Sequence, residues 1–325
     1  MSMKAVRVHE FGGPEVLSYD DVPTPEPGPN DVLVQQQVIG VNYSDTQYRR
    51  GRYGGELPFI PGHEGGGTIV KTGADVNGFR PGDRVVYAGQ HRLGTYKETM
   101  AVAASALVRV PQDVDLKLAT AVLNQGRTAH YLTHDAHPLT SGERVLIHAA
   151  AGGVGSNLVQ MAKRRGTYVY ATVSTAEKAD FVRDLGADEV ILYSEVDFEE
   201  EVKRRTSGEG VDVVFDALGG DILLKSLRCL KRKGHLVTYG QTSGPPPPLE
   251  WPQRGLGSIY LSYHTGPDYV HPGEEADRRD GEIFGWVREG ELKVHIHGEH
   301  ALKDASAAHR EIENRGTIGK LLLIP

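Results

Sequence analysis

Small residues at fixed spacing mark one place in this chain where chemistry could occur. The stretch Val145–Gly155 begins as a short apolar run typical of a buried parallel strand, then breaks into Ala150-x-Gly152-x-x-Gly155. The residues from Ser156 onward have the apolar spacing of a helix. A pyrophosphate can approach backbone N–H groups and a helix N-terminus only where no Cβ blocks it. A tight turn without a ligand looks similar, but the setting between strand and helix favours dinucleotide binding, with Ala150 replacing the usual first glycine.

The residues after the next expected strand, Tyr168–Val173, predict which dinucleotide is bound. An NAD site places an acidic residue at this strand tip. Here the tip carries Ser174, and Lys178 follows one turn into the next expected helix. A hydroxyl and an ammonium suit a 2′-phosphate, so we expect NADPH rather than NADH. The alternative is that Ser174 and Glu177 form a capping box and Lys178 is a solvated charge. Tyr193 either flanks the adenine or phosphate or is an ordinary strand-end tyrosine.

Composition limits the class of protein. The chain has 325 residues, 39% hydrophobic and 24% charged, with a net charge of −7, so we expect a globular protein of two domains that does not bind nucleic acid. Its one cysteine, Cys229, excludes an internal disulfide or multi-cysteine zinc site and is expected in the core. No apolar run reaches the ~18 residues that span a bilayer, and the N-terminus has no signal-peptide pattern. We therefore expect a cytoplasmic protein that is not bound to membranes.

The secondary-structure elements that would position these residues form two regions with different sequence patterns. The first region, to about Leu123, is rich in glycine and short apolar runs and predicts a bent β fold rather than helices, with strands at 3–8, 15–20 and 32–39. The second alternates strand and helix, which predicts a doubly wound parallel sheet. Its expected strands are 145–149, 168–173, 189–193, 211–215, 235–240 and 258–263, and its expected helices are 156–165, 176–185, 197–206 and 221–232. After about Gly266 we expect helices at 273–290 and 305–314 and a final strand at 320–324.

Five motifs occur in order along the chain, and together they carry a family resemblance. They are Asn42-Tyr-Ser-Asp45, Pro61-Gly-His-Glu-Gly-Gly-Gly67, Pro81-Gly-Asp-Arg-Val85, His148-Ala-Ala-Ala-Gly-Gly-Val-Gly155 and Arg315-Gly-Thr-Ile-Gly-Lys320. As a set they resemble the zinc-free, zeta-crystallin-like quinone oxidoreductases of the medium-chain dehydrogenase/reductase superfamily, over essentially the whole chain.

The resemblance implies an α/β protein with a GroES-like, β-rich catalytic domain built from both chain ends, and a central Rossmann domain with a doubly wound parallel sheet. The expected boundaries are 1–124 for the first part of the catalytic domain, 125–265 for the NADPH-binding domain and 266–325 for the C-terminal part of the catalytic domain. It also implies NADPH bound in the cleft between the domains, and a homodimer, for which Ser258–Tyr263 as an edge strand could pair across a two-fold axis.

The same resemblance assigns residues by position. Asn42 and Asp45 are expected near the nicotinamide. Thr128 and Arg315 are expected to contact the cofactor, and Ser174, Lys178 and Tyr193 its 2′-phosphate end. The expected pyrophosphate turn is Ala150, Gly152, Gly153, Val154 and Gly155, and the loop passing over the nicotinamide is Tyr239, Gly240 and Gln241. Two departures from the family pattern are Gln47, where many relatives have tyrosine, and the proline-rich loop Thr242–Pro248.

A metal site is not expected, although Gly62-His63-Glu64 resembles a tripeptide of the zinc alcohol dehydrogenases. Catalytic zinc needs about three protein ligands, usually including thiolate or imidazole. Asn42 and, approximately, Asn124 stand where those relatives supply cysteines, and the four-cysteine lobe is missing. We therefore expect His63 to be a hydrogen-bonded loop histidine, and we assign no site to the His295–His300 segment.

The absence of a zinc ligand set bears on the substrate. Zinc lowers the pKa of an alcohol, whereas a quinone or activated alkene accepts hydride without a Lewis acid. Tyr48 or Tyr53 is the candidate hydrogen-bond donor to the developing oxyanion, with Asn42 orienting the nicotinamide or a water. Alternatively, both tyrosines pack at the rim of the cleft. The leading hypothesis is an NADPH:quinone oxidoreductase. The other hypotheses are an NADPH-dependent enone reductase of the same fold, and an NADPH-binding protein without significant turnover.

Overall fold

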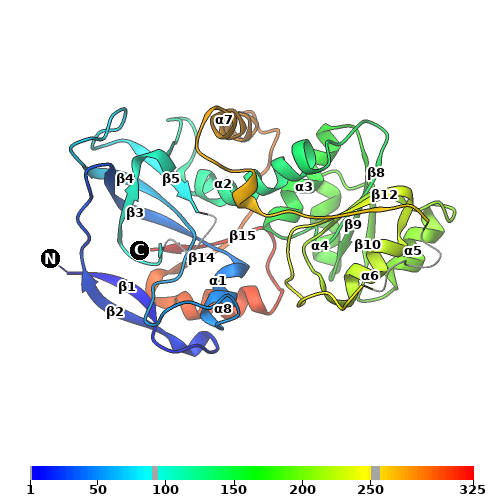
Figure 1. Ribbon diagram of the computed structural model, residues 1–325, viewed down its shortest axis with the longest axis horizontal. Coiled ribbons are helices and arrows are strands. Elements are labelled where there is room, and N and C mark those ends of the chain that lie inside the picture. Colours follow the sequence, from blue (N-terminus) through cyan, green and yellow to red (C-terminus); the bar gives the residue numbers. More distant parts are fainter. Residues whose placement is uncertain (1, 90–93, 250–256) are drawn as a thin grey trace. The chain divides into compact units, whose positions relative to one another are not determined.

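The protein divides into two compact units in a computed structural model, which describes residues 2–89, 94–249 and 257–325 (Figure 1). Unit 1 comprises Met1–Arg127 and His271–Pro325, and unit 2 comprises Thr128–Val270. Unit 1 therefore joins the two ends of the chain, and unit 2 is the central segment. Both divisions fall a few residues later than the boundaries we expected from the sequence. The first division lies inside helix α2 (Leu116–Tyr131), which continues from one unit into the next.

Unit 1 is built mainly from antiparallel strands. β1 pairs with β2, and a larger sheet has the order β14-β15-β3-β4-β5-β7, with β6 also pairing with β3. Its strands are β1 Ser2–Val8, β2 Leu17–Pro23, β3 Asp31–Val41, β4 Glu64–Thr72, β5 Arg84–Ala88, β6 Thr99–Ala103, β7 Val108–Arg109, β14 Ile296–Ala301 and β15 Lys320–Ile324. Its helices are α1 Tyr43–Arg49, most of α2, α7 Glu274–Arg288 and α8 Ala305–Glu313, with short 3-10 turns at Pro14–Val16, Ala104–Ala106 and Leu302–Asp304.

Two chain ends meet in the large sheet of unit 1. The C-terminal strand β15 pairs antiparallel with β3 and parallel with β14. The glycine-rich strand β4 pairs with β3 on the other side, with a shift in register between Gln36 and Val38. At Gly67 a Cβ would overlap the Gln35 main chain, so this irregularity excludes a side chain there. The glycines predicted a bent β fold, and this is confirmed. The expectation of no helices before Leu123 is wrong, because α1 and the start of α2 lie in that region.

Unit 2 has a doubly wound parallel sheet, which confirms the predicted fold class. The strand order is β10-β9-β8-β11-β12-β13, and every neighbouring pair is parallel. This is the dinucleotide-binding arrangement, in which the order of connection reverses between the first and fourth strands. The strands are β8 Arg144–Ile147, β9 Tyr168–Val173, β10 Glu189–Leu192, β11 Val211–Asp216, β12 Leu230–Thr238 and β13 Tyr260–Tyr263, and the helices are α3 Gly153–Arg164, α4 Ala176–Asp184, α5 Phe198–Arg205 and α6 Gly220–Arg228. A π-helical turn (Leu132–Ala136) follows α2, and a 3-10 turn occupies Gly266–Asp268.

Three details of unit 2 differ from the sequence prediction. Helix α3 begins at Gly153 rather than Ser156, because the glycine turn already forms the first helical turn. Helix α6 ends at Arg228, and β12 begins at Leu230, so the helix predicted to continue to 232 is wrong. The N-cap of α4 is Thr175, whose side chain accepts a hydrogen bond from the Lys178 N–H at 3.3 Å, so the capping box starting at Ser174 is also wrong.

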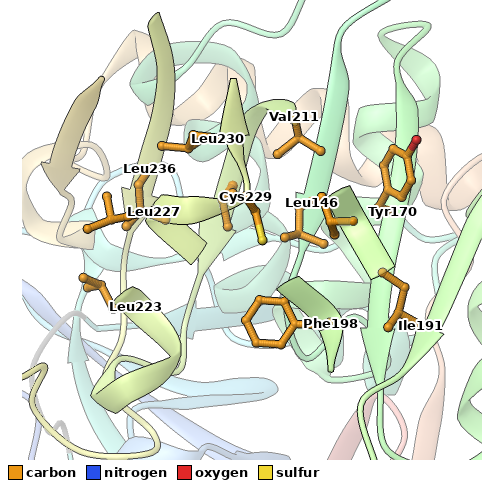
Figure 2. Close-up of a cluster of buried hydrophobic side chains, with 12 residues drawn as sticks. Leu146, Tyr170, Ile191, Phe198, Val211, Leu223, Leu227, Cys229, Leu230 and Leu236 are labelled. Carbon is orange, nitrogen blue, oxygen red and sulfur yellow. The ribbon is translucent and has the colours of Figure 1, made fainter. Parts of the chain in front are cut away.

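An apolar cluster holds the helices of unit 2 against its sheet. Figure 2 shows Cys229 in the middle of this cluster, with Leu227 and Leu236 on one side and Leu146 on the other. Burial raises the pKa of the Cys229 thiol to about 12. The thiol is therefore held in its neutral form, and Cys229 is a core residue as predicted. No helix among the residues placed in the structure has the length and apolar character needed to cross a bilayer.

Helix α3 packs closely against the β8–α3 turn that precedes it. A Cβ on Gly155 would overlap the Ala149 carbonyl oxygen and lie 2.8 Å from the Ala150 Cα. Ala149 itself has φ of 49°, a left-handed conformation that L-residues other than Gly, Asn and Asp rarely adopt. The turn is thus held in an uncommon conformation, and α3 lies against it without space for a methyl group.

We expect Gly155→Ala to destabilise unit 2, because the methyl group would meet main-chain atoms that cannot rotate away. The expected loss is about 1–3 kcal/mol of unfolding free energy, measured as a lowered urea-unfolding midpoint. Gly285→Ala on α7 is the matched control, since its Cβ would meet no atom within 4 Å and alanine favours a helix. Equal stability of Gly155→Ala and the native protein would contradict this close packing.

Candidate functional site

The motif Asn42-x-x-Asp45 forms the N-terminus of helix α1. Asn42 is the N-cap residue, and its backbone N–H donates to Asp45 Oδ2 at 2.8 Å. The helix thus begins with its third residue bonding back to the cap, which fixes Asp45 against the main chain. Both side chains are buried, and the Asp45 side chain is completely inaccessible. The spacing of the motif is therefore set by the geometry of one helical turn.

The Asn42 side chain is held by a buried ion pair between Glu64 and Lys320. Glu64 Oε1 contacts Lys320 Nζ and accepts a hydrogen bond from Asn42 Nδ2 at 2.7 Å. Lys320 Nζ also donates to Asn42 Oδ1 at 3.0 Å. A carboxylate accepts hydrogen bonds and an ammonium donates them, so the two charges together dictate which way the Asn42 amide faces. Glu64 begins β4, and Lys320 begins β15.

Helix α2 provides a further polar contact with this pair. With its amide oriented to satisfy its neighbours, Gln125 donates to the Ala121 carbonyl and accepts from Lys320 Nζ, both at 2.7 Å. Asn124 Nδ2 lies 3.4 Å from Asn42 Oδ1. Lys320 thus has three oxygen partners while buried, which compensates for the water it has lost.

A second group of buried polar residues lies around Asp45. Asp45 Oδ1 contacts His63 Nδ1, and Asp45 Oδ2 accepts from the Tyr96 hydroxyl at 3.1 Å. Burial alone would raise the pKa of Asp45, but the neighbouring groups, His63 first among them, together outweigh it, so the pKa is lowered from 3.8. Asp45 is therefore a buried carboxylate. The prediction that His63 is a hydrogen-bonded histidine is confirmed, and its partner is Asp45.

The contacts continue from Tyr96 to the surface through helix α8. The Tyr96 hydroxyl lies 3.0 Å from His309 Nε2, and His309 Nδ1 lies 2.9 Å from Arg49 Nη1. Burial lowers the pKa of His309 to about 4, so it is neutral near pH 7. Arg49 carries only donors, so His309 Nδ1 accepts and Nε2 bears the proton. Arg49 ends this chain of contacts at Glu313, 2.6 Å away.

The two candidate tyrosines lie on and just after α1. The rings of Tyr48 and Tyr53 meet edge to face with centroids 5.0 Å apart, and the Tyr48 ring lies 5.3 Å from that of His63. Tyr53 is 57% exposed, whereas Tyr48 is half-buried. The structure therefore places Asp45 and Tyr48 against His63, with Asn42 next to Asp45 and Tyr53 next to Tyr48. Gln47 is buried and donates to Thr46 Oγ1 at 2.9 Å, so it belongs to the packing of α1.

In unit 2 the expected pyrophosphate turn joins β8 to α3. Ala150 is buried, Gly152 is the N-cap of α3, and no side chain caps this helix end. Gly153, Val154 and Gly155 form the first helical turn. An uncapped helix N-terminus whose N–H groups are flanked by glycine can accept an anion, so these residues fit a pyrophosphate.

The remaining cofactor candidates lie at strand or helix ends. Ser174 is half-buried after β9, and Tyr193 is exposed after β10. Lys178 is 9% exposed, and burial lowers its pKa. Tyr239, Gly240 and Gln241 follow β12, Thr128 lies on α2, and Arg315 follows α8.

Two of these positions have a structural role of their own. Arg315 has φ of 56°, and its N–H bonds to the Ile312 carbonyl at 3.2 Å, the arrangement that ends a helix. Burial, followed by the charge of Asp216, raises the pKa of the Tyr239 hydroxyl, so it stays protonated. Asp216 ends β11. Burial raises its pKa to about 6, although hydrogen bonds from two backbone N–H groups act in the opposite direction.

Comparison with known proteins identifies the family. A family described as alcohol dehydrogenase GroES-like domain matches residues 28–112, and one described as zinc-binding dehydrogenase matches residues 153–266. A quinone oxidoreductase of Pseudomonas aeruginosa is 38% identical over 99% of both chains. The chain belongs to the quinone oxidoreductase family of the medium-chain dehydrogenase/reductase superfamily. Within this family, a 2-haloacrylate reductase of a Burkholderia species is also 38% identical, over 100% of this chain and 99% of that protein.

The fold agrees with solved structures of the family. The structure of Escherichia coli quinone oxidoreductase complexed with NADPH has a TM-score of 0.95 and 35% identity, covering 99% of this chain and 100% of that one. The mixed architecture and the family resemblance predicted from the sequence are thereby confirmed.

The family description mentions zinc, but the residues here do not fit a zinc site. Zinc needs about three protein ligands. Among the described residues, no group of three or more histidine, cysteine, aspartate or glutamate side chains could hold a metal ion. The Asp45 carboxylate already contacts His63 and Tyr96, and the Glu64 carboxylate already contacts Lys320. Of these groups, only the Nε2 atom of His63 would remain as a metal ligand. We derive no chemical step from a metal.

Sequence reasoning did not find Tyr96, His309 or Lys320 as part of this site. His63 was expected to be hydrogen-bonded but without a named partner, and Glu64 was considered only as part of a metal-binding tripeptide. One signal was present, because a buried Asn-x-x-Asp motif requires donors for its carboxylate. The sequence did not say which donors, since His309 and Lys320 are far from α1 along the chain.

We expect Lys320→Met to destabilise the protein strongly, because it leaves the Glu64 carboxylate buried without its counter-charge. The expected loss is about 3 kcal/mol of unfolding free energy. Lys117→Met is the matched control: it breaks an exposed pair with Glu299, which should cost less than about 1 kcal/mol. Urea unfolding measures both. If adding Glu64→Gln to Lys320→Met restored no stability, the buried pair would not be the cause.

Proposed function

We propose that this protein transfers hydride from NADPH to a quinone without a metal ion. The observation that carries the proposal is the uncapped, glycine-flanked N-terminus of α3 in a protein of the quinone oxidoreductase family. When bound, NADPH supplies the hydride. The chain's own residues hold the pyrophosphate at Gly152–Gly155 and surround the acceptor with oriented polar groups near α1.

NADPH rather than NADH is supported by the residues beyond β9. No carboxylate stands at that strand tip, and Lys178 lies in the first turn of α4, whose N-cap is Thr175. Burial lowers the Lys178 pKa, and a nearby phosphate would stabilise the ammonium form again. An NADPH-bound solved relative is consistent with this choice.

Zinc independence, a cytoplasmic location and a homodimer complete the proposal. The acceptor needs no Lewis acid if it is a quinone or activated alkene, and the donor set does not match zinc. A single buried cysteine fits a reducing compartment. The strand β13 pairs with β12 and exposes Tyr260 and Tyr263, so it offers an edge for a second copy. The acidic net charge argues against nucleic acid as a partner.

Reduction of an activated carbon–carbon double bond is the second candidate. It is favoured by one observation, the full-length likeness to 2-haloacrylate reductase at 38% identity. Both reactions need the same cofactor and the same oriented polar groups, so the shape of the acceptor pocket separates them.

We expect the purified protein to oxidise NADPH rapidly with 1,4-benzoquinone or a naphthoquinone, and NADH slowly, measured as the fall in absorbance at 340 nm. Activity with an enone or haloacrylate alone would move the substrate class to the second candidate. NADPH binding without turnover of any acceptor would contradict both and favour a non-catalytic NADPH-binding protein.

We expect Lys178→Met to raise KM for NADPH by about 10- to 150-fold while KM for NADH stays unchanged, because a charge-assisted contact to the 2′-phosphate contributes about 1.5–3 kcal/mol. The control is Lys203→Met on α5, a surface lysine paired with Glu199 at 2.6 Å. An equal change in KM for both cofactors would show that Lys178 acts through folding rather than through the phosphate.

A further inference from the structure

The buried pair of Asp45 and His63 has a chemical use that the binding of NADPH does not require. Reducing a quinone by hydride adds two electrons and one hydrogen to the acceptor, which leaves negative charge on an oxygen. Completing the hydroquinone requires a proton from a donor in contact with that oxygen. This proton is not supplied by the hydride donor, so a group of the protein or a water must provide it.

His63 has the arrangement of such a donor. Its Nδ1 is engaged by Asp45 Oδ1, and its side chain is almost completely buried at 4% exposure. No hydrogen bond of its Nε2 is found to the part of the chain that the structure describes. The ring lies against that of Tyr48, 5.3 Å between centroids. This nitrogen, unpaired among the described residues, therefore belongs to a nearly buried side chain beside Tyr48, one of the candidate acceptor residues.

The surroundings of Asp45 determine the protonation of His63. The Tyr96 hydroxyl receives its hydrogen bond from His309 Nε2–H, so it directs its own proton to Asp45 Oδ2. The Asn42 N–H also donates to Oδ2. Both bonds favour the carboxylate form. Burial opposes it, but the neighbouring groups, His63 first among them, lower the pKa of Asp45. An ionised Asp45 requires a proton on His63 Nδ1, which leaves Nε2 as the position that gains and loses a proton.

We propose that His63 is a catalytic residue, the general acid that protonates the reduced acceptor, and that Asp45, Tyr96 and His309 are positioning residues. This rests on the proposed function. In the step, the Nε2–H bond of the imidazolium breaks and an O–H bond forms on the acceptor. His63 becomes neutral and retains its Nδ1–H bond to Asp45. A proton from solvent then restores Nε2–H. The sum is one quinone, one NADPH and one proton giving one hydroquinone and one NADP⁺.

Charged and titratable groups of the described residues surround His63 as follows. Asp45 from α1 contacts it directly, and Tyr48 from the same helix contacts its ring. Tyr96 reaches it through Asp45, while His309 from α8 and Arg49 from α1 act through Tyr96. The buried pair of Glu64, the residue after His63, and Lys320 is linked to Asp45 through Asn42. Among these charged groups, Asp45 is the one with a hydrogen bond to the ring.

The test compares His63→Asn with the native protein. The asparagine amide can still donate to Asp45 from the position of Nδ1, so the fold should persist, but it cannot transfer a proton. We expect kcat for a naphthoquinone to fall about 100-fold with KM for NADPH unchanged. The native fall in kcat at high pH, where the acid is deprotonated, should be absent from the variant. His300→Asn, which breaks a surface contact with Glu311, is the matched control and should leave kcat unchanged.

Acceptor basicity separates proton donation from packing. The loss in His63→Asn should be smaller for electron-poor quinones, whose reduced oxygens are less basic and need less help from an acid. The same fold-loss for every quinone, with the native pH profile retained, would overturn the proposal. So would unchanged kcat. Tyr96→Phe should shift the pH profile while retaining more activity than His63→Asn, as expected of a positioning residue.

A second measurement does not depend on turnover. In the free protein, nitrogen NMR of the histidines should show His63 with Nδ1 protonated throughout and Nε2 titrating, and Asp45→Asn should remove this preference. A neutral His63 that carries its proton on Nε2 would overturn the proposal. If none of the quinones tested supported NADPH oxidation by the native protein, the proposed function itself would fail. That result differs from a native protein that is active with quinones and whose activity His63→Asn leaves unchanged, which would overturn only the role of His63.

Discussion

Unit 1 depends on charges that are buried together with their partners. Glu64 and Lys320 come from strands on either side of β3, and both lose nearly all contact with water. A buried ion is costly unless its counter-charge and hydrogen-bond partners are in place, so this pair forms only when the C-terminal strand β15 is correctly docked. The pair thereby ties the end of the chain to its beginning, and it orients Asn42 at the start of α1.

The same constraint explains why the polar groups near α1 form a continuous series. Asp45 is buried as a carboxylate, and the Tyr96 hydroxyl that donates to it is held by His309, which Arg49 holds in turn. Such networks are stable when every member is satisfied, and they then have a single arrangement of protons. The series ends at Glu313 near the surface, so no charge in it is left without compensation.

Unit 2 differs in that it has main-chain N–H groups that an anion could approach. The β8–α3 turn uses small residues and an uncommon Ala149 conformation to expose a helix N-terminus that no side chain caps. The open helix N-terminus of unit 2 thus depends on the absence of side chains, whereas the polar network of unit 1 depends on side chains that are present and paired.

The sequence by itself determined the parts of this protein that depend on neighbours along the chain. The Ala150-x-Gly152-x-x-Gly155 turn, the alternation of strand and helix and the parallel sheet of unit 2 follow from local spacing, because one strand, one turn and one helix form each repeat. Errors arose where local signals competed: Leu230 began a strand instead of extending α6, and Thr175 rather than Ser174 capped α4. Helix α1 was not predicted, because it is short, lies in a glycine-rich region and is stabilised by its cap and its packing rather than by a long helical pattern.

Only the tertiary structure decided which groups surround Asn42 and Asp45. Arg49 and His309 are 260 positions apart in the sequence, and Glu64 and Lys320 are 256 apart. Nothing in the spacing of either segment encodes the other, because the contact arises from sheet pairing and helix docking between the two ends of the chain. The sequence showed that His63 lies in a loop near a glycine-rich strand, and the fold alone supplied the Asp45 carboxylate that orients its ring. Charge pairing in the interior is a property of the assembled sheet, and for this reason it cannot be derived from local sequence.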